Sequence, residues 1–180
     1  DTISRKFAYE IRNQITKKPE NKQIKIMGII GASEESVILM LTSLILGAHH
    51  CICFEDLSSE AIRQRLDIFQ PDIVIFKNNI KEKVEVTINQ NEKVKVPILE
   101  IDLHKIKNNL KFKIDKVGSY NKNTNLFTLF TSGSTGKPKA IVHGVHEYLN
   151  YAKYTTEYFF GIKKNSKIFT AVDAGWINGH

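Results

Sequence analysis

Three short apolar runs, separated by segments suited to helices, constrain the fold of this chain more than any other feature. The runs are "IKIMGII" (Ile24–Ile30), "HCICF" (His50–Phe54) and "IVIFK" (Ile73–Lys77). Between them, Ser33 and Gly47 are suited to begin and end one helix, and Ser58 or Ser59 can cap a second helix that continues to Phe69. Strands that alternate with helices of roughly 10 to 15 residues are typical of a parallel sheet covered by helices. The sequence therefore predicts an α/β fold with a helix-covered, mostly parallel sheet.

An amphipathic helix is predicted at the start of the chain, because Ile3, Phe7, Ile11 and Ile15 recur at every fourth residue. After Lys77 the pattern is weaker. The sequence there predicts a short helix spanning Ile80 to Ile88, a strand at Lys95–Ile101, an irregular connection at His104–Asn125, strands at Leu126–Phe130 and Lys139–Gly144, a helix at Glu147–Phe160, and a strand at Lys167–Val172.

Composition narrows the class of protein. Hydrophobic residues make up 42% and charged residues 25% of the 180 residues, as in a globular domain. The most apolar stretch, Ser36–Ala48, is shorter than the roughly 20 residues of a membrane-spanning helix, so we interpret it as a buried helix and expect no membrane contact. Two cysteines cannot build a disulfide framework, and we therefore expect a reducing, cytoplasmic location.

The net charge of +7 raises the question of a nucleic-acid partner. Most of the excess lies in the lysine- and asparagine-rich stretch from Lys77 to Lys122, which has no arginine-rich run and no basic motif spaced with aromatic residues. We interpret this stretch as solvated surface and expect no nucleic-acid partner.

The stretch Thr131–Ala140, "TSGSTGKPKA", has the residue types of a phosphate-binding loop. It is not a Walker A loop, because two residues separate Gly133 from Gly136 where that motif has four, and Pro138 opposes a helix after Lys137. Glycines can turn their backbone N–H groups toward an anion, hydroxyls add donors, and Lys137 and Lys139 add positive charge. A flexible turn between two strands is the alternative, but apolar strands on both sides favour a polyphosphate site.

The longer stretch "FTSGSTGKPKAIVHG" (Phe130–Gly144) resembles the phosphate-loop motif of the adenylate-forming superfamily, which includes acyl-CoA synthetases, peptide-synthetase adenylation domains and luciferases. His143, four residues after Lys139, is similar to the acetyl-CoA synthetase branch. Two further stretches also resemble this branch. They are "LILGAHHCICF" followed by "LSSEAIRQRL", and "DAGWINGH" (Asp173–His180). The resemblance covers nearly the whole chain and is weakest between Asn78 and Asn125.

This resemblance implies a ligase that works in two steps. A short carboxylate, acetate or a similar acid, would attack the α-phosphate of ATP to give an acyl-adenylate, and coenzyme A would then displace AMP. The loop would bind the β- and γ-phosphates through Thr131, Ser132, Gly133, Ser134, Thr135, Gly136, Lys137 and Lys139. Thr135 would also contact Mg²⁺ shared with the phosphates. Trp176, Ile177 and Asn178 would line the pocket for the acid and the entrance for coenzyme A.

The sequence departs from the family pattern around coenzyme A. Glu55 and Asp56 stand where the branch has two glycines, and no arginine occurs near Glu82 where one is expected. The family's adenine- and ribose-binding segments and its catalytic C-terminal domain lie beyond His180. We therefore expect residues 1–180 to be part of an adenylation domain, inactive alone, with catalytic residues elsewhere. The alternative is a non-catalytic, adenylation-like module that binds a nucleotide or an acidic partner.

Two further clusters have structural interpretations. His49, His50, Cys51 and Cys53 could bind zinc, but no second ligand pair of suitable spacing exists, so core packing is favoured. Tyrosines spaced by three and four residues are predicted to form one helix face packed on the sheet, with nucleotide stacking as the alternative. They are Tyr148, Tyr151, Tyr154 and Tyr158.

Overall fold

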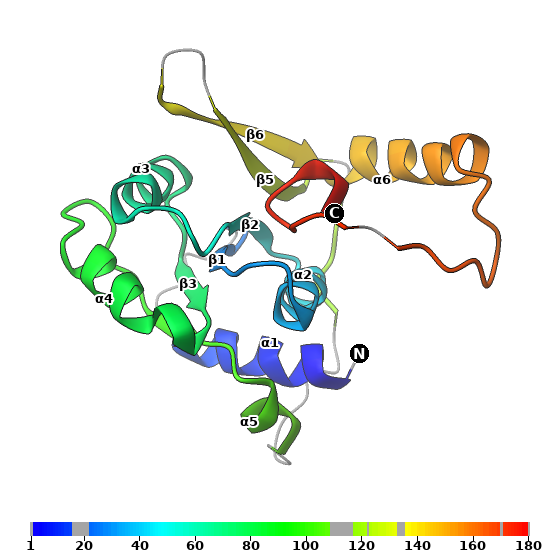
Figure 1. Cartoon of the computed structure of the whole chain (residues 1–180). Helices are drawn as coiled ribbons and strands as arrows, with labels where there is room; N and C mark the ends of the chain where they lie inside the picture. Colours follow the sequence, from blue (N-terminus) through cyan, green and yellow to red (C-terminus); the bar gives the residue numbers. More distant parts are fainter. Residues whose placement is uncertain are drawn as a thin grey trace.

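The computed structural model describes residues 2–15, 22–108, 117–121, 123–132, 136–169 and 171–179. Helices and strands alternate along most of this chain (Figure 1). The helices are α1 (Thr2–Gln14), α2 (Glu34–Leu46), α3 (Ser59–Phe69), α4 (Lys81–Asn89), α5 (Leu103–Asn108) and α6 (Val145–Tyr154). The strands are β1 (Lys25–Ile29), β2 (His49–Cys53), β3 (Ile73–Phe76), β4 (Ile98–Glu100), β5 (Asn125–Ser132) and β6 (Pro138–Gly144).

The six strands form one sheet in the order β4-β3-β1-β2-β5-β6. The pairs β1–β2, β1–β3, β2–β5 and β3–β4 are parallel, and β6 alone of these strands runs antiparallel to its neighbour, β5. The predicted α/β class with a mostly parallel, helix-covered sheet is therefore confirmed.

Alternate residues of the buried strands supply two separate cores. On one face, Ile26 and Ile75 pack with residues of α1, α2 and α5, such as Phe7 and Leu39. On the other face, Met27, Cys51 and Val74 pack with residues of α3 and α4. Because strand side chains alternate between faces, uninterrupted apolar runs such as "IKIMGII" are what a sheet covered on both sides requires.

Ser33, Gly47 and Ser58 occupy the predicted end positions of α2 and α3, and the side chain of Ser58 forms a cap hydrogen bond. Ser33 precedes α2 in an extended conformation, and its backbone N–H donates to Ser36 Oγ. Gly47 ends α2 with a φ of 67°, a left-handed conformation that glycine adopts at low cost. The side chain of Ser58 accepts a hydrogen bond from the backbone N–H of Ala61 at 3.2 Å. The residues at the helix ends thus set the lengths of the helices, and α2 and α3 begin where the sequence predicts.

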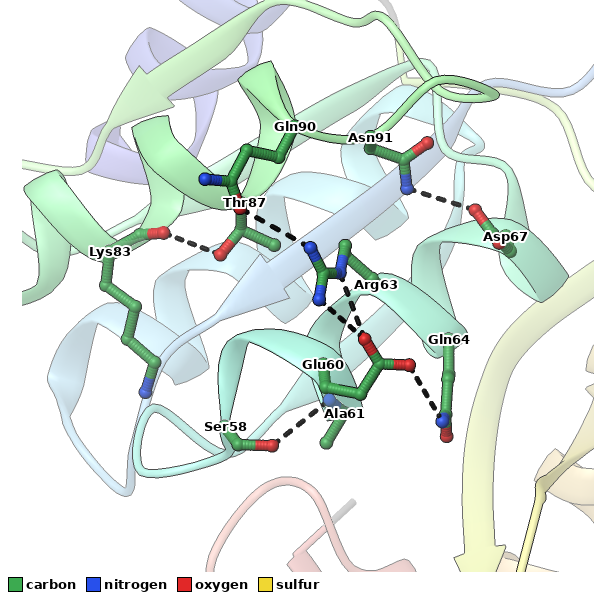
Figure 2. Close-up of polar contacts among 10 residues, drawn as sticks. All are labelled: Ser58, Glu60, Ala61, Arg63, Gln64, Asp67, Lys83, Thr87, Gln90 and Asn91. Atoms are coloured by element: carbon green, nitrogen blue, oxygen red, sulfur yellow. Dashed lines mark hydrogen bonds and ion pairs between the residues drawn. The ribbon is translucent and has the colours of Figure 1, made fainter.

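Polar contacts join α3 to α4 (Figure 2). Arg63 reaches from α3 to the side chain of Gln90 at the end of α4, and Asn91 donates to the carboxylate of Asp67 at 3.0 Å. These contacts fix the position of α4, and with it Lys83, relative to the segment that follows β2.

The hairpin formed by β5 and β6 extends beyond the rest of the sheet. The β2–β5 ladder contains the pairs His50–Phe127 and Cys51–Thr128, whereas the β5–β6 ladder continues to the pair Ser132–Pro138. The end of the hairpin accordingly projects from the body of the protein (Figure 1).

The structure corrects three sequence predictions. A helix, α5, occupies the start of the predicted irregular connection; Asp102 Oδ1 accepts hydrogen bonds from the backbone N–H groups of His104 and Lys105, as an N-cap does. The strand predicted at Lys167–Val172 is wrong, because the described residues of that segment belong to no strand. The predicted strand Lys95–Ile101 shortens to Ile98–Glu100.

A fourth correction concerns the tyrosine stripe on α6 and the π-helical turn that follows it, Thr155–Phe159. Tyr148 packs edge-on against Phe127, with 4.7 Å between the ring centroids. Tyr151, Tyr154 and Tyr158 are 68%, 53% and 73% exposed. The predicted packed face is therefore wrong for these three, because α6 covers the hairpin with its first turn and does not lie along the sheet.

The histidines and cysteines of β2 are core residues, as favoured over a zinc site. Cys51 and Cys53 are free thiols within the core on the α3 and α4 side, with their sulfurs 3.9 Å apart. His49 is buried, and its Nε2 shares a 2.7 Å hydrogen bond with Thr128 Oγ1. Among the described residues no helix is long and apolar enough to span a bilayer, and no cluster of three or more metal-binding side chains occurs.

Acid should destabilise the fold through His49. Burial and then the nearby charge of Lys25 lower the pKa of His49 to about 4, below its usual 6.5. Neutral His49 therefore stabilises the fold above pH 6.5, and this stability is lost as the pH falls toward the folded-state pKa, by about 3 kcal/mol at pH 4. His49→Gln should flatten the pH dependence of the free energy of unfolding, measured by urea titration. The exposed control His146→Gln should leave it unchanged; an equal effect of both variants contradicts the assignment.

The tyrosines of α6 should differ in their contribution to stability. Tyr148→Ala removes ring contacts to Phe127 and His143, so the free energy of unfolding should fall by about 2 kcal/mol. Tyr151→Ala, on the same helix but 68% exposed, should change it by less than about 0.5 kcal/mol. Chemical denaturation of both variants measures the difference, and similar losses would mean that Tyr151 is covered in solution.

Candidate functional site

The carboxyl ends of the parallel strands converge at one edge of the sheet. Connections leave this edge in opposite directions, because β1 leads through α2 to β2 on one side and β3 leads through α4 to β4 on the other. In open α/β sheets, ligands bind outside the carboxyl ends at such a switch point. Lys77, directly after β3, lies here with its Nζ 3.5 Å from Glu35 Oε2 of α2. The topology alone therefore selects this edge.

The turn after β2, Phe54–Leu57, is tied to its surroundings from several sides. Glu55 Oε2 accepts a 3.3 Å hydrogen bond from the backbone N–H of Gly31, which follows β1. Lys83 of α4 donates to the backbone oxygen of Glu55 at 2.9 Å, and the N–H of Leu57 donates to the oxygen of Phe54 at 3.4 Å. Glu55 therefore has a structural function in this turn. Asp56 is exposed beside it, and Glu82 is exposed in the first turn of α4.

The end of the β5–β6 hairpin gathers the predicted phosphate-binding residues that the structure describes. Thr131 and Lys139 are directly paired across the two strands, and Ser132 is paired with Pro138. The side chains of Thr131, Ser132, Lys137 and Lys139 are all exposed. Gly136 has a φ of 77°, with open space where a Cβ would be. Gly133, Ser134 and Thr135 lie outside the described residues. The hairpin thus presents two hydroxyls and two ammonium groups to solvent within a few residues.

One neighbour of this hairpin, Arg65, carried no recognisable signal in the sequence. The guanidinium carbon of Arg65, on α3, lies 5.4 Å from the centroid of the Phe130 ring, one residue before Thr131. His143 stacks on Phe127 at 4.5 Å, and burial lowers its pKa. Arg65 thereby places a third cation beside the hairpin, and His143 packs at its base.

The remaining predicted site residues lie in a compact turn near the end of the chain. Asp173 holds this turn, because its Oδ1 accepts from Gly175 N–H at 2.8 Å and its backbone oxygen accepts from Trp176 N–H at 3.0 Å. Trp176 is 60% exposed. Ile177 is also exposed and begins a short 3₁₀ turn, Ile177–Gly179, that includes Asn178.

The turn contacts the carboxyl edge of the sheet through an aromatic pair. The rings of Phe54 and Trp176 lie 5.8 Å apart at an interplanar angle of 49°. Phe54 follows β2 three residues after Cys51, and Thr131 lies on β5 three residues after Thr128, the partner of Cys51. The β5–β6 hairpin and the Trp176 turn are therefore both associated with the carboxyl ends of adjacent strands, β5 and β2.

Comparison with known proteins identifies the family. Residues 21–180 match the family described as AMP-binding enzyme. The chain belongs to this family. Acetyl-coenzyme A synthetase of Helicobacter pylori (strain G27) is 32% identical over 97% of this chain and 30% of its own length. Acetyl-coenzyme A synthetase 1 of Candida albicans is 32% identical over 81% of the chain and 25% of its own length.

Solved structures of similar proteins share the fold of this AMP-binding chain. Acetoacetyl-CoA synthetase from Streptomyces lividans aligns with a TM-score of 0.81 at 16% identity, over 97% of this chain and 29% of its own. The luciferase-like enzyme of the mealworm Zophobas morio aligns with a TM-score of 0.68 at 19% identity, over 86% and 37%. The resemblance to adenylate-forming enzymes is confirmed. The chain spans 25% to 30% of the length of the two curated relatives named above.

Proposed function

We propose that this chain is part of an AMP-forming acid–thiol ligase, which activates acetate or a similar short carboxylate with ATP and transfers the acyl group to coenzyme A. The observation that carries the proposal is the exposed cluster of hydroxyls and ammonium groups at the end of the β5–β6 hairpin. Membership of the AMP-binding enzyme family and similarity to acetyl-coenzyme A synthetases supply the reaction class. Residues 1–180 would form part of the adenylation domain, in a cytoplasmic enzyme.

In this proposal, the hairpin binds the polyphosphate of ATP. Lys137 and Lys139 offset the charge of the β- and γ-phosphates, and the exposed side chains of Thr131 and Ser132 donate hydrogen bonds. Gly136, with its positive φ, lets the backbone approach the phosphates closely. Gly133, Ser134 and Thr135 would complete the cradle, with Thr135 beside Mg²⁺. When bound, Mg²⁺ neutralises charge that develops on the departing pyrophosphate.

The first step places more demand on positioning and charge than on proton transfer. An oxygen of the carboxylate attacks the α-phosphorus, the bond to the β-phosphate oxygen breaks, and pyrophosphate leaves with the electron pair. The ammonium group of Lys139 on β6 and the hydroxyl of Thr131 on β5 would stabilise that leaving group at a fixed place, because the two residues are directly opposite in the ladder. In the second step the coenzyme A sulfur attacks the acyl carbonyl and AMP leaves.

The acid and coenzyme A would meet at the turn that follows Asp173. Trp176 would form a rigid wall that excludes long acids, and Ile177 and Asn178 would line the pocket and the entrance for coenzyme A. Near the turn after β2, Glu55 is engaged with Gly31 and Lys83 with the backbone of Glu55, so the phosphates of coenzyme A would instead meet the exposed Lys81 of α4.

Removing a loop cation should impair the two half-reactions unequally. In the enzyme produced from the complete gene, Lys137→Ala should slow adenylate formation by roughly 10- to 100-fold, the value of one charge-assisted hydrogen bond. Transfer from preformed acyl-adenylate to coenzyme A should change far less, because pyrophosphate has already left. Rapid-quench assays of each half-reaction measure both. The exposed lysine variant Lys163→Ala is the control; equal losses in both half-reactions would exclude the phosphate-binding assignment.

Removing the indole of Trp176 should widen acid selection. Trp176→Gly opens space at the proposed acyl pocket, so the ratio of kcat/KM for hexanoate to that for acetate should rise by roughly 10-fold or more. The measurement is pyrophosphate exchange into ATP across acids of two to eight carbons. A chain-length profile that does not change on this substitution would show that Trp176 does not bound the pocket.

A further inference from the structure

The outer half of the β5–β6 hairpin receives little support from the other strands. The ladder between β2 and β5 contains the pairs His50–Phe127 and Cys51–Thr128, whereas β5 continues to Ser132. In the described sheet β6 is an edge strand and pairs with β5 alone. A two-stranded hairpin is at best marginally stable by itself in water. The position of the hairpin end therefore depends on what packs against its faces.

Helix α3 packs against one face of this hairpin and contacts β6. Phe130 of β5 is half-buried and packs against the core that contains Ile62 and Leu66 of α3. The guanidinium carbon of Arg65, on the same helix, lies 5.4 Å from the centroid of the Phe130 ring, within the range of a cation–π contact. Helix α3 thus holds the hairpin through apolar packing and through one cation.

The Arg65 side chain is itself fixed on α3. Its Nη1 donates a 2.8 Å hydrogen bond to the backbone oxygen of Ala61, one turn earlier in the helix, and the side chain is partly buried. Helix α3 is joined in turn to the end of α4 by the hydrogen bond from Arg63 to Gln90. The guanidinium is therefore a fixed point on the body of the protein, and the Phe130 ring lies against it.

Side-chain alternation places Arg65 and the proposed phosphate-binding side chains on opposite faces of the hairpin. Phe130 faces α3, so the next residue, Thr131, faces away from that helix. Lys139 is directly opposite Thr131 in the ladder and shares its face. Arg65 therefore acts on these two side chains through the strands, and not by sharing a ligand with them.

We propose that Arg65 is a positioning residue for the phosphate-binding hairpin. By holding Phe130 against α3, it fixes the end of β5 and thereby presents Thr131 and Lys139 to the polyphosphate of ATP. This second half of the inference rests on the proposed function, whereas the first half, that Arg65 restrains the hairpin, involves no ligand. Arginine suits the task because its planar guanidinium can lie over a ring while an N–H group binds a helix carbonyl.

Cleavage by the lysine-specific protease Lys-C tests the first half, in the enzyme produced from the complete gene and without ligand. Cleavage after Lys139 requires the hairpin to open locally, and cleavage after the exposed Lys163 is the internal reference. Arg65→Met keeps an unbranched stem without the cation and should raise the ratio of the two rates by roughly 3- to 10-fold. Arg65→Lys should give a ratio closer to wild type. Arg63→Met, on the same helix, is the matched control and should leave the ratio unchanged.

A double-mutant cycle tests whether Arg65 acts through the Phe130 ring. Phe130→Leu keeps an apolar side chain but removes the aromatic face. In the Phe130→Leu background, Arg65→Met should change the cleavage ratio by less than about 2-fold, because the contact is already lost. Equal effects of Arg65→Met in both backgrounds would overturn the proposal, since Arg65 would then act by another route.

The two half-reactions test the second half in the same enzyme. Arg65→Met should lower kcat/KM for ATP in adenylate formation by roughly 3- to 10-fold, because charge stabilises the departing pyrophosphate only where it is correctly placed. Transfer from preformed acyl-adenylate to coenzyme A should stay within about 2-fold of wild type. Arg65→Lys should recover adenylate formation in part, and Arg63→Met should not alter it. Equal losses in both half-reactions would show a general structural function and overturn the proposal.

The outcomes separate this proposal from the one on which it rests. Unchanged cleavage after Lys139 in Arg65→Met overturns the positioning function, whatever the kinetics. Increased cleavage with normal adenylate formation also overturns it, provided that Lys137→Ala impairs that step. If Lys137→Ala does not impair it either, the phosphate-binding assignment fails, and with it the second half of this inference, while the restraint by Arg65 stands. Increased cleavage together with a selective loss of adenylate formation supports the proposal.

Discussion

The parallel pairing of β1 with both β2 and β3 determines where every other functional feature can lie. Ile26 pairs with His50 on one side and with Ile73 on the other, so the three strands end together. Each connection then returns through a helix, α2 on one face and α3 or α4 on the other. Parallel strands must be joined by such crossovers. Where two neighbouring connections turn to opposite faces of the sheet, no helix covers the carboxyl ends of the strands, and this edge is open to a ligand. Gly31, Phe54 and Lys77 meet at that edge for this reason.

Because β6 is antiparallel to β5, polar side chains can extend past the carboxyl edge of the sheet. A sixth parallel strand would have required another helix after β5, whereas a hairpin returns at once and projects its tip beyond the sheet. Thr131 and Lys139 can then face the same ligand from paired strands. Buried residues up to Leu129 hold the base of the hairpin, and exposed polar residues form its end. The rigid base and the polar end fit the proposed binding of a polyphosphate.

The sequence predicts the core of the fold well because local signals and burial agree there. Ser58 caps α3 and Gly47 ends α2 where the spacing of apolar residues indicates. The strand predicted at Lys167–Val172 fails because alternating apolar residues identify a strand only if a partner strand is available. The tyrosine stripe fails for a related reason: spacing shows that Tyr151 and Tyr158 share a face of the helix, and it does not show whether another element covers that face.

The residues of the candidate site also divide into those that the sequence could identify and those that it could not. Motif residues such as Lys137 and Trp176 can be named from the sequence, because their spacing resembles a known family. Phe54 and Arg65 could not be named, because their importance arises from contacts between segments far apart in the chain, Phe54 with Trp176 and Arg65 with Phe130. Neither contact leaves a pattern in a single sequence. Their assignment needs the register of β2 with β5 and the packing of α3 against the hairpin.

The central claim is that a carboxylate is activated by attack on the α-phosphate of ATP. Acetate labelled with ¹⁸O in both carboxylate oxygens tests it directly, in the enzyme produced from the complete gene with ATP, Mg²⁺ and coenzyme A. Through an acyl-adenylate, one labelled oxygen stays on phosphorus when coenzyme A takes the acyl group, so mass spectrometry should find ¹⁸O in the AMP. Unlabelled AMP, or ¹⁸O in orthophosphate accompanied by ADP, would contradict the account.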